Sequence, residues 1–304
     1  MIGRSIGLVA LAVGLMGMAP HPGKAPVKAP HASPQEIIDK SPATAWKAID
    51  AEDLVVMNLA DGNVVTYALA PFAPVHVANI RALVRQGYFD GASILRVQDD
   101  YVVQWGRPDE DPTKPTSIIA NPPAEYEFKL TQIKDAKFRP LPYRDAYAPK
   151  AGTIAGWPAA SDGKTGWLVH CYGMIGVARD NPPSTGDSTQ LYTVIGHAPR
   201  HLDRNLAVVG RIVSGMAFLT DQKRGTGDLG FYTDKAQDVP IAGVRLASEM
   251  PAAERPAYQY MDTDSATFAH YLHVRANRHD AFYDHPAGGV DLCNVQVPAR
   301  KKPA

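Results

Sequence analysis

Residues 87–106 read GYFDGASILRVQDDYVVQWG, and this stretch decides the fold. Residues 93–97 and 101–105 are rich in β-branched, aromatic and other apolar side chains, which favour strands. The polar Gln98-Asp99-Asp100 between them is typical of a turn. We therefore expect two neighbouring strands, with Arg96 on the first and Gln104 on the second.

The residues before this stretch predict a hairpin and a helix. Apolar runs at 54–59 and 64–69 flank Ala60-Asp61-Gly62-Asn63, and an Asp-Gly pair between two such runs favours a β-hairpin. From Pro74 the apolar residues recur at helical spacing until Gly87, a residue type that often ends a helix. A shorter helix is expected after Ser33, where a proline and an acidic residue follow a capping residue.

The residues after this stretch predict further short strands. They are expected at 126–133, 167–172, 191–195 and 207–213. Residues 139–164 are rich in Pro, Gly, Ala and Tyr and lack periodicity, which predicts a long irregular insertion. Many short strands with few helices indicate a mainly β protein, either a sandwich or a barrel.

The two ends of the chain differ from the middle. Arg4 followed by the apolar run 6–19 is typical of an export signal, and a proline-rich linker follows to residue 32. The alternative, a buried or interfacial helix, is disfavoured by those prolines. We expect an exported, periplasmic protein without a stable membrane anchor once the signal is cleaved. The main domain is expected at 33–240, and 241–304 is expected to be a C-terminal α/β extension with strands at 244–247 and 290–297 and a helix at 265–283.

Charge and cysteine content limit the partners of the chain. Lys+Arg and Asp+Glu both number 31, so no strong field attracts nucleic acid. Cys171 and Cys293 are either a disulfide of an oxidising compartment or two buried thiols. The histidines and aspartates between residues 262 and 285 match no zinc-binding spacing, so we expect exposed polar faces there and no metal site.

Three stretches, in order along the chain, resemble the cyclophilin family of peptidyl-prolyl isomerases. They are Ala73-Pro74-Val75-His76-Val77-Ala78-Asn79-Ile80-Arg81-Ala82-Leu83, the block at 87–106, and the series that runs from Gly176-Val177-Ala178 through Ser188-Thr189-Gln190-Leu191-Tyr192 and His201-Leu202-Asp203 to Val209-Gly210-Arg211-Ile212-Val213-Ser214-Gly215-Met216. The resemblance implies a closed, antiparallel, eight-stranded β-barrel capped by two helices, with a substrate groove on its outside. It implies no cofactor.

The resemblance also implies roles for individual residues. Arg96 matches the catalytic arginine, and the expected substrate-binding residues are Tyr101, Val103, Gln104, Ala178, Gln190, Tyr192 and Leu202. Three positions depart from the family pattern: His201 stands where tryptophan is common, Leu206 where a histidine is common, and Arg179 where an amide is usual. The loop 179–189 is also two residues longer than the common form.

The chemistry implied is rotation about peptide bonds that precede proline. Resonance makes this rotation slow, with a barrier of about 18–20 kcal/mol, and a guanidinium that donates to the prolyl nitrogen helps only when the bond is twisted. The expected function is isomerisation of X-Pro bonds in exported proteins as they fold, with proline-containing peptides and unfolded exported proteins as partners. The alternative is a catalytically weak chaperone or scaffold that binds proline peptides. The sequence carries no expectation for the oligomeric state.

Overall fold

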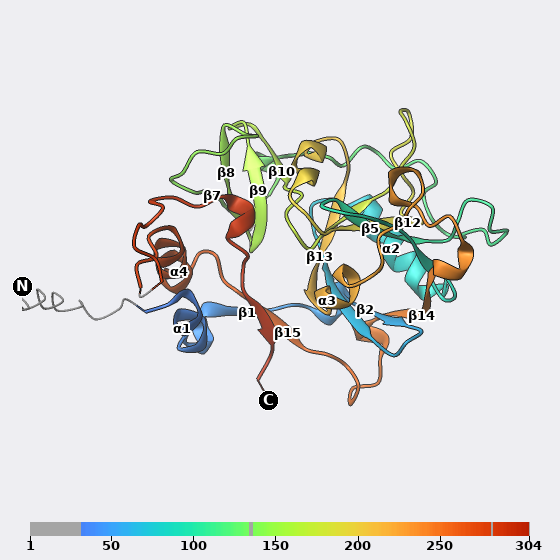
Figure 1. Cartoon of the computed structure of the whole chain (residues 1–304), viewed down its shortest axis with the longest axis horizontal. Coiled ribbons are helices and arrows are strands. Elements are labelled where there is room, and N and C mark those ends of the chain that lie inside the picture. The colour runs from blue at the N-terminus through green and yellow to red at the C-terminus, as the bar shows by residue number, and fades with distance from the viewer. Residues whose placement is uncertain (1–31, 134–135, 281, 304) are drawn as a thin grey trace, which may run out of the picture.

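A computed structural model describes residues 32–133, 136–280 and 282–303 (Figure 1). The apolar run 6–19, on which the expected export signal rests, lies outside the described residues. No helix in the described part of the chain has the length and apolar character needed to cross a membrane.

Eight antiparallel strands close into a barrel, on the right in Figure 1. This confirms the predicted mainly β fold. Their order around the barrel is β11-β12-β5-β4-β14-β2-β3-β13, and β13 pairs back with β11. The strands are β2 (Leu54–Leu59), β3 (Val64–Leu69), β4 (Ser93–Gln98), β5 (Val102–Gly106), β11 (Met174–Val177), β12 (Gln190–Val194), β13 (Val208–Ser214) and β14 (Val239–Leu246).

The barrel interior is filled by apolar side chains and closed by two helices. Side chains alternate between the two faces of a strand, so every second residue of β5, such as Val103 and Trp105, points inward. Helix α2 (Pro74–Arg85) begins with a proline, whose fixed φ suits the first turn, and buries Ile80 and Leu83 completely against the same core. Helix α3 (Met216–Thr220) adds Leu219 to it. The interior of the barrel is therefore a packed core.

The stretch expected to be an irregular insertion forms a second sheet instead. Five strands lie in the order β6-β10-β9-β8-β7, to the upper left of the barrel in Figure 1. They are β6 (Phe128–Lys129), β7 (Phe138–Pro140), β8 (Lys150–Ile154), β9 (Trp157–Ser161) and β10 (Thr165–Leu168). The prediction failed because several central paired residues, such as Ala151, Gly152, Ala159 and Ala160, are alanine or glycine, which give no apolar alternation. The strand expected at 126–133 is limited to β6, since Leu130–Gln132 forms a 3₁₀ turn, and the strand expected at 167–172 ends at Leu168.

A third unit joins the two ends of the described chain. Strand β15 (Tyr258–Met261) pairs with β1 (Trp46–Ala48) on one side and with β16 (Ala299–Lys301) on the other. Helices α1 (Pro34–Asp39) and α4 (Ala266–Ala276) pack together beside this sheet. The C-terminal extension therefore includes residues from the start of the expected main domain.

Several expected bounds in the C-terminal part differ from the structure. Strand β14 is a barrel strand, so the barrel continues past the expected boundary at residue 240 to Leu246. Helix α4 begins after the capping Ser265, as expected, but ends at Ala276 rather than at 283. The strand expected at 290–297 is instead a 3₁₀ turn, Leu292–Asn294, because Asp291 caps it through the backbone N–H of Cys293. The last strand lies later, at β16.

Two links tie these units to the barrel. Of the two interpretations open for the cysteines, the structure has the disulfide, which joins Cys171, just before β11, to Cys293 in the extension. The second link is the fully buried Arg200, which donates to both carboxylate oxygens of Asp145 at 3.0 and 2.9 Å and to Asp203 at 3.1 Å. Asp145 lies between β7 and β8, so this cluster joins the second sheet to the segment beside the barrel.

The Asp145 carboxylate makes the stability of the protein sensitive to acid. Burial raises its pKa, but the hydrogen bonds and charge of Arg200 outweigh that effect and leave the pKa below its ordinary value. A carboxylate whose folded pKa is lowered contributes stability at pH values above its unfolded pKa of about 3.9 and loses it as the pH falls further. We expect Asp145→Asn to cost about 3 kcal/mol at pH 7, because the buried Arg200 guanidinium loses one of its two carboxylate partners.

Denaturant unfolding between pH 7 and pH 3 measures both effects. The difference in unfolding free energy between the parent and Asp145→Asn should shrink below about pH 4. The control is Asp264→Asn, which breaks the exposed ion pair with Arg139 and should cost less than about 1 kcal/mol at pH 7. Equal costs for the two variants would show that the buried cluster contributes no more than a surface pair.

Candidate functional site

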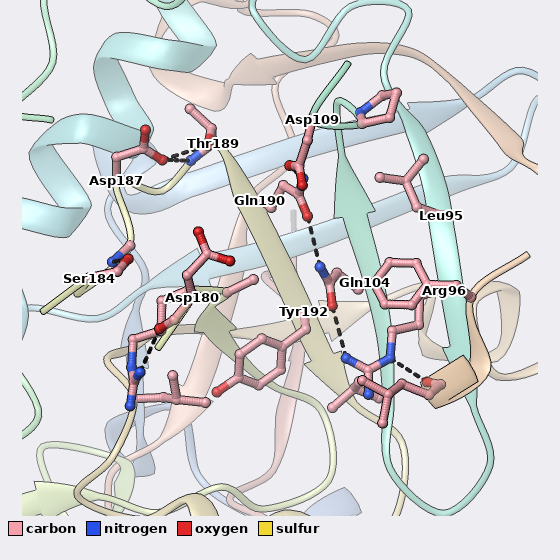
Figure 2. A pocket seen from close by; sticks show the side chains of 18 of the residues that line it. Leu95, Arg96, Gln104, Asp109, Asp180, Ser184, Asp187, Thr189, Gln190 and Tyr192 are labelled. Carbon is pink, nitrogen blue, oxygen red and sulfur yellow. Dashed lines mark hydrogen bonds between the residues drawn. The ribbon is translucent and has the colours of Figure 1, made fainter. Parts of the chain in front are cut away.

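A groove of about 730 Å³ lies on the outer face of β4, β5 and β12 (Figure 2). The segment 229–235 forms one rim, and the loop 178–189 forms the other. In the part of the chain that the structure describes, no group of histidine, cysteine or acidic side chains has the arrangement of a metal site.

A β-bulge places Arg96 in the groove. Ile94 pairs with Trp105 and Arg96 pairs with Gln104, which leaves Leu95 as an extra residue without a partner on β5. Ile94 and Trp105 point into the barrel core, whereas Leu95, Arg96 and Gln104 line the groove. A bulge of this kind re-aims side chains on a regular strand. It gives the groove two adjacent residues of β4 where a regular strand would give one.

The Arg96 guanidinium is held from several sides. Its Nε donates to the carbonyl oxygen of Leu229 at 2.6 Å and its Nη1 donates to Oε1 of Gln104 at 3.2 Å, while Nη2 donates to Gln98 (Figure 2). The rings of Tyr101 and Phe231 lie 5.5 and 5.3 Å from it, within the range of cation–π attraction.

Arg96 stays charged although it is half-buried. Burial lowers its pKa, and the neighbouring Tyr101 opposes that shift. An arginine remains protonated near neutral pH even after a substantial decrease, because its ordinary pKa is so high. Among the described residues, no carboxylate lies within ion-pair distance of it. The groove therefore contains a fixed cation whose charge is not neutralised by a protein acid.

Gln104 and Gln190 form a relay that leads away from Arg96. Gln104 Nε2 donates to Oε1 of Gln190 at 2.8 Å, and Gln190 Nε2 donates to the carbonyl of Arg107 at 2.9 Å and to Asp109 at 3.0 Å (Figure 2). Each amide is thereby fixed in orientation. The backbone register matches this arrangement, since Gln104 faces Tyr192 on β12 and Gln190 faces Gly106 on β5.

An apolar slot lies beside the guanidinium. Its walls are Tyr101, Val102, Ala178, Tyr192, Leu202 and Leu206. Tyr101 stacks on His201, with ring centroids 5.8 Å apart and planes within 13°. Burial raises the pKa of both Tyr101 and Tyr192, so both phenols are neutral near pH 7. The slot has the apolar, aromatic surface that suits a prolyl ring.

The structure brings together every predicted substrate-binding residue except one. Tyr101, Gln104, Ala178, Gln190, Tyr192 and Leu202 all line the groove with Arg96. Val103 does not, because it is completely buried and belongs to the barrel core. Its neighbour Val102 lines the groove instead. Side-chain alternation could have shown this, since Val102 and Gln104 share one face of the strand and Val103 must point to the other.

Sequence reasoning also missed the rim that covers Arg96. Residues 225–232 lie along the part of β4 that does not pair with β14, with the N–H of Gly225 donating to Val97 at 2.9 Å and that of Tyr232 donating to Leu95 at 3.1 Å. Leu229 and Phe231 on this rim are large apolar residues with 66% and 37% of their surface exposed. The glycines in this stretch indicate only a loop, and no local signal places it beside Arg96.

The rim yields a test of how Arg96 is oriented. We expect Phe231→Ala to lower kcat/KM for isomerisation of an X-Pro tetrapeptide by about fivefold, because one ring that flanks the guanidinium contributes about 1 kcal/mol. The measurement is a protease-coupled isomerisation assay. The control is Phe282→Ala, which removes an 82% exposed phenylalanine that does not line the groove. An equal loss of kcat/KM in both variants would contradict the role assigned to Phe231.

Comparisons with known proteins agree with this geometry. The family model described as Cyclophilin type peptidyl-prolyl cis-trans isomerase/CLD matches residues 54–246. A probable peptidyl-prolyl cis-trans isomerase of Brucella abortus (strain 2308) is 25% identical over 179 residues, which are 59% of this chain and 76% of that protein. The corresponding protein of Brucella suis biovar 1 (strain 1330) gives the same values.

One solved structure is similar beyond the barrel. The cyclophilin AquaCyp293 from Hirschia baltica superposes with a TM-score of 0.65 at 21% identity and covers 89% of this chain and 98% of its own. At this identity the likeness concerns the fold. The match to residues 54–246, by contrast, runs from the first barrel strand, β2, to the end of β14, and so includes the strands that carry the groove.

Proposed function

We propose, since the chain belongs to the cyclophilin-type peptidyl-prolyl cis-trans isomerase family, that it isomerises X-Pro bonds of exported proteins as they fold. The isomerase activity follows from the family. The assignment of the groove residues to that activity, and of exported proteins as substrates, is what we propose. The observation that carries it is the charged Arg96 beside an apolar slot lined by Tyr101, Tyr192 and Leu202.

The proposed mechanism needs no bond to form or break. The slot between Tyr101, Tyr192 and Leu202 holds the prolyl ring while the preceding carbonyl rotates. At the twisted transition state the prolyl nitrogen recovers a lone pair, and the Arg96 guanidinium donates a hydrogen bond to it. Because the lone pair is absent in both planar states, this contact favours the transition state alone. Gln104 orients the guanidinium and can contact the peptide backbone.

The free energies that these contacts can contribute are large enough for the rate acceleration of an isomerase. A ten-thousand-fold acceleration requires about 5.5 kcal/mol, at about 1.4 kcal/mol per factor of ten. A preorganised donor aimed at developing charge contributes about 3–4 kcal/mol in other enzymes, and the remainder is within reach of fixing the prolyl ring in one orientation. The hydrogen bonds that fix Arg96 before substrate arrives are therefore part of the catalytic arrangement.

Export is supported by the N-terminal pattern of Arg4 and the apolar run 6–19, and by the disulfide, a bond typical of oxidising compartments. Expression of the full chain with a C-terminal tag in a Gram-negative bacterium tests this. We expect the tagged protein in the periplasmic fraction, with an N-terminus that lacks the apolar run. A variant without residues 2–20 should remain in the cytoplasm. Recovery of the full chain in the cytoplasm with Met1 still present would contradict export.

A second candidate function, peptide binding with weak turnover, is favoured by the altered slot. Leu206 lines the slot where the family often has a histidine, and Arg179 donates to the carbonyls of Asn205 and Asp180 rather than pointing freely into the groove. Isomerisation of a proline tetrapeptide and suppression of aggregation of an unfolded protein, measured on the same sample, separate the two. High turnover with little suppression supports the enzyme, and the reverse supports the chaperone.

A further inference from the structure

A buried histidine stands directly behind the prolyl slot. His170 follows β10, has none of its surface exposed and does not line the groove. Its Nε2 lies 2.8 Å from the hydroxyl oxygen of Tyr192, and the two rings are nearly parallel, with 10° between their planes. His170 therefore contacts a wall of the slot from the side opposite to the substrate.

The other side of the imidazole determines which nitrogen carries the proton. Oδ1 of Asp203 lies 3.0 Å from Nδ1 of His170 and also accepts from the backbone N–H of His170 at 2.9 Å. An ionised carboxylate can only accept, so Nδ1 carries the proton. In the neutral ring Nε2 is then an acceptor, and the Tyr192 hydroxyl must donate to it. The phenol proton is thereby directed away from the groove.

Further contacts hold Asp203 and Tyr192 in place. Arg200 donates to the second oxygen of Asp203 at 3.1 Å, and Arg200 is itself fixed by two hydrogen bonds from its guanidinium to Asp145. The Tyr192 hydroxyl lies close above Gly176, where a Cβ atom would come within 2.2 Å of the oxygen. The phenol is thus confined by the barrel backbone on one side and by His170 at its tip.

We propose that His170 is a positioning residue for proline binding: as a hydrogen-bond acceptor it fixes the Tyr192 wall of the slot, and through Asp203, Arg200 and Asp145 it makes that wall depend on the second sheet. This inference rests on the proposed function of the groove. The Tyr192 ring would contact the prolyl ring in the planar and the twisted states alike. A loosened wall therefore weakens binding in both states, which raises KM and leaves kcat nearly unchanged.

A double-mutant cycle tests the proposal. His170→Phe keeps the ring volume but removes the acceptor, and we expect it to raise KM for an X-Pro tetrapeptide about fivefold with kcat within about twofold. In a Tyr192→Phe background the same change should alter KM by less than about twofold, because the hydroxyl on which His170 acts is already gone. His170→Gln, which offers an acceptor again, should recover part of the loss. Equal effects in both backgrounds would overturn the proposal.

A second measurement does not depend on how the variants fold. The ¹⁵N chemical shifts of the His170 ring in the parent protein identify its tautomer, and we expect Nδ1 to carry the proton and Nε2 to be an acceptor. A ring protonated at Nε2 alone would overturn the proposal. If the parent protein itself lacks isomerase activity, the proposed function fails, whereas normal parent activity with an unchanged KM in His170→Phe defeats only the positioning role.

Discussion

Replacement of Arg96 by alanine is expected to lower kcat/KM for an X-Pro tetrapeptide by about 100- to 1,000-fold, the loss seen when one preorganised donor to a transition state is removed. KM should change little, because the prolyl nitrogen has no lone pair to offer in the planar states. The decrease should therefore appear in kcat. A protease-coupled assay with the full chain measures both constants.

Arg96→Lys separates charge from geometry. Lysine keeps the positive charge but lacks the planar fork that donates to Leu229, Gln98 and Gln104 at once. We expect Arg96→Lys to have less than a tenth of the kcat/KM of the parent protein. The matched control is Arg139→Ala, which removes a half-exposed arginine outside the groove and should leave both kinetic constants unchanged. Full activity in Arg96→Ala would refute the catalytic assignment of Arg96 and would mean that other groups in the groove stabilise the transition state.

Loss of the disulfide is the second large expected effect. Cys171 and Cys293 are 122 residues apart in the chain, and a cross-link over such a loop stabilises by about 4–5 kcal/mol in the chain-entropy model. We expect the double variant Cys171→Ser/Cys293→Ser to lose about that much unfolding free energy in denaturant titrations, because two serines form no cross-link.

Reductant provides the control for this prediction. The parent protein in excess dithiothreitol should approach the stability of the double variant, whereas the double variant itself should not respond. Because Cys171 follows His170, the variant should also show a raised KM for proline peptides if the disulfide helps to hold that segment. An unfolding free energy within about 1 kcal/mol of the parent would show that the second sheet and extension hold together without the bond.

The strands of the barrel could be predicted because they carry strong local patterns, whereas the closed barrel itself was expected only from the family resemblance. The hairpin of β2 and β3 has the bounds that the two apolar runs and the Asp-Gly turn indicate. The second sheet could not be predicted from sequence, because its strands pair through residues such as Ala151, Ala159 and Ala160 that have little strand preference. Gly152 explains why small residues are needed there, since a Cβ atom would come within 2.0 Å of the Arg139 carbonyl oxygen.

The candidate site was predictable where one continuous motif carries it. Arg96, Tyr101 and Gln104 lie within eight positions of one another around a single turn, and the pairing of β4 with β5 brings Arg96 and Gln104 opposite each other. Leu229 and Phe231 reach the groove from a distant segment, and His170 contacts the Tyr192 hydroxyl from behind the groove. Nothing in their neighbouring residues indicates that position, and Val103 was misassigned because its strand face was not considered.

The pairing of β14 with β2 determines how early the barrel can form while the chain is being synthesised. The barrel cannot close until residues 239–246 are available to lie between β4 and β2. Strand β1 has no partner until β15 has been synthesised, and the other edge of β15 pairs with β16, which comes later still. A polypeptide that leaves the ribosome from its N-terminus therefore carries unpaired strand edges for most of its synthesis. Such a chain cannot close its barrel before residue 246 has been synthesised, and its β1-β15-β16 sheet can form only after residue 301.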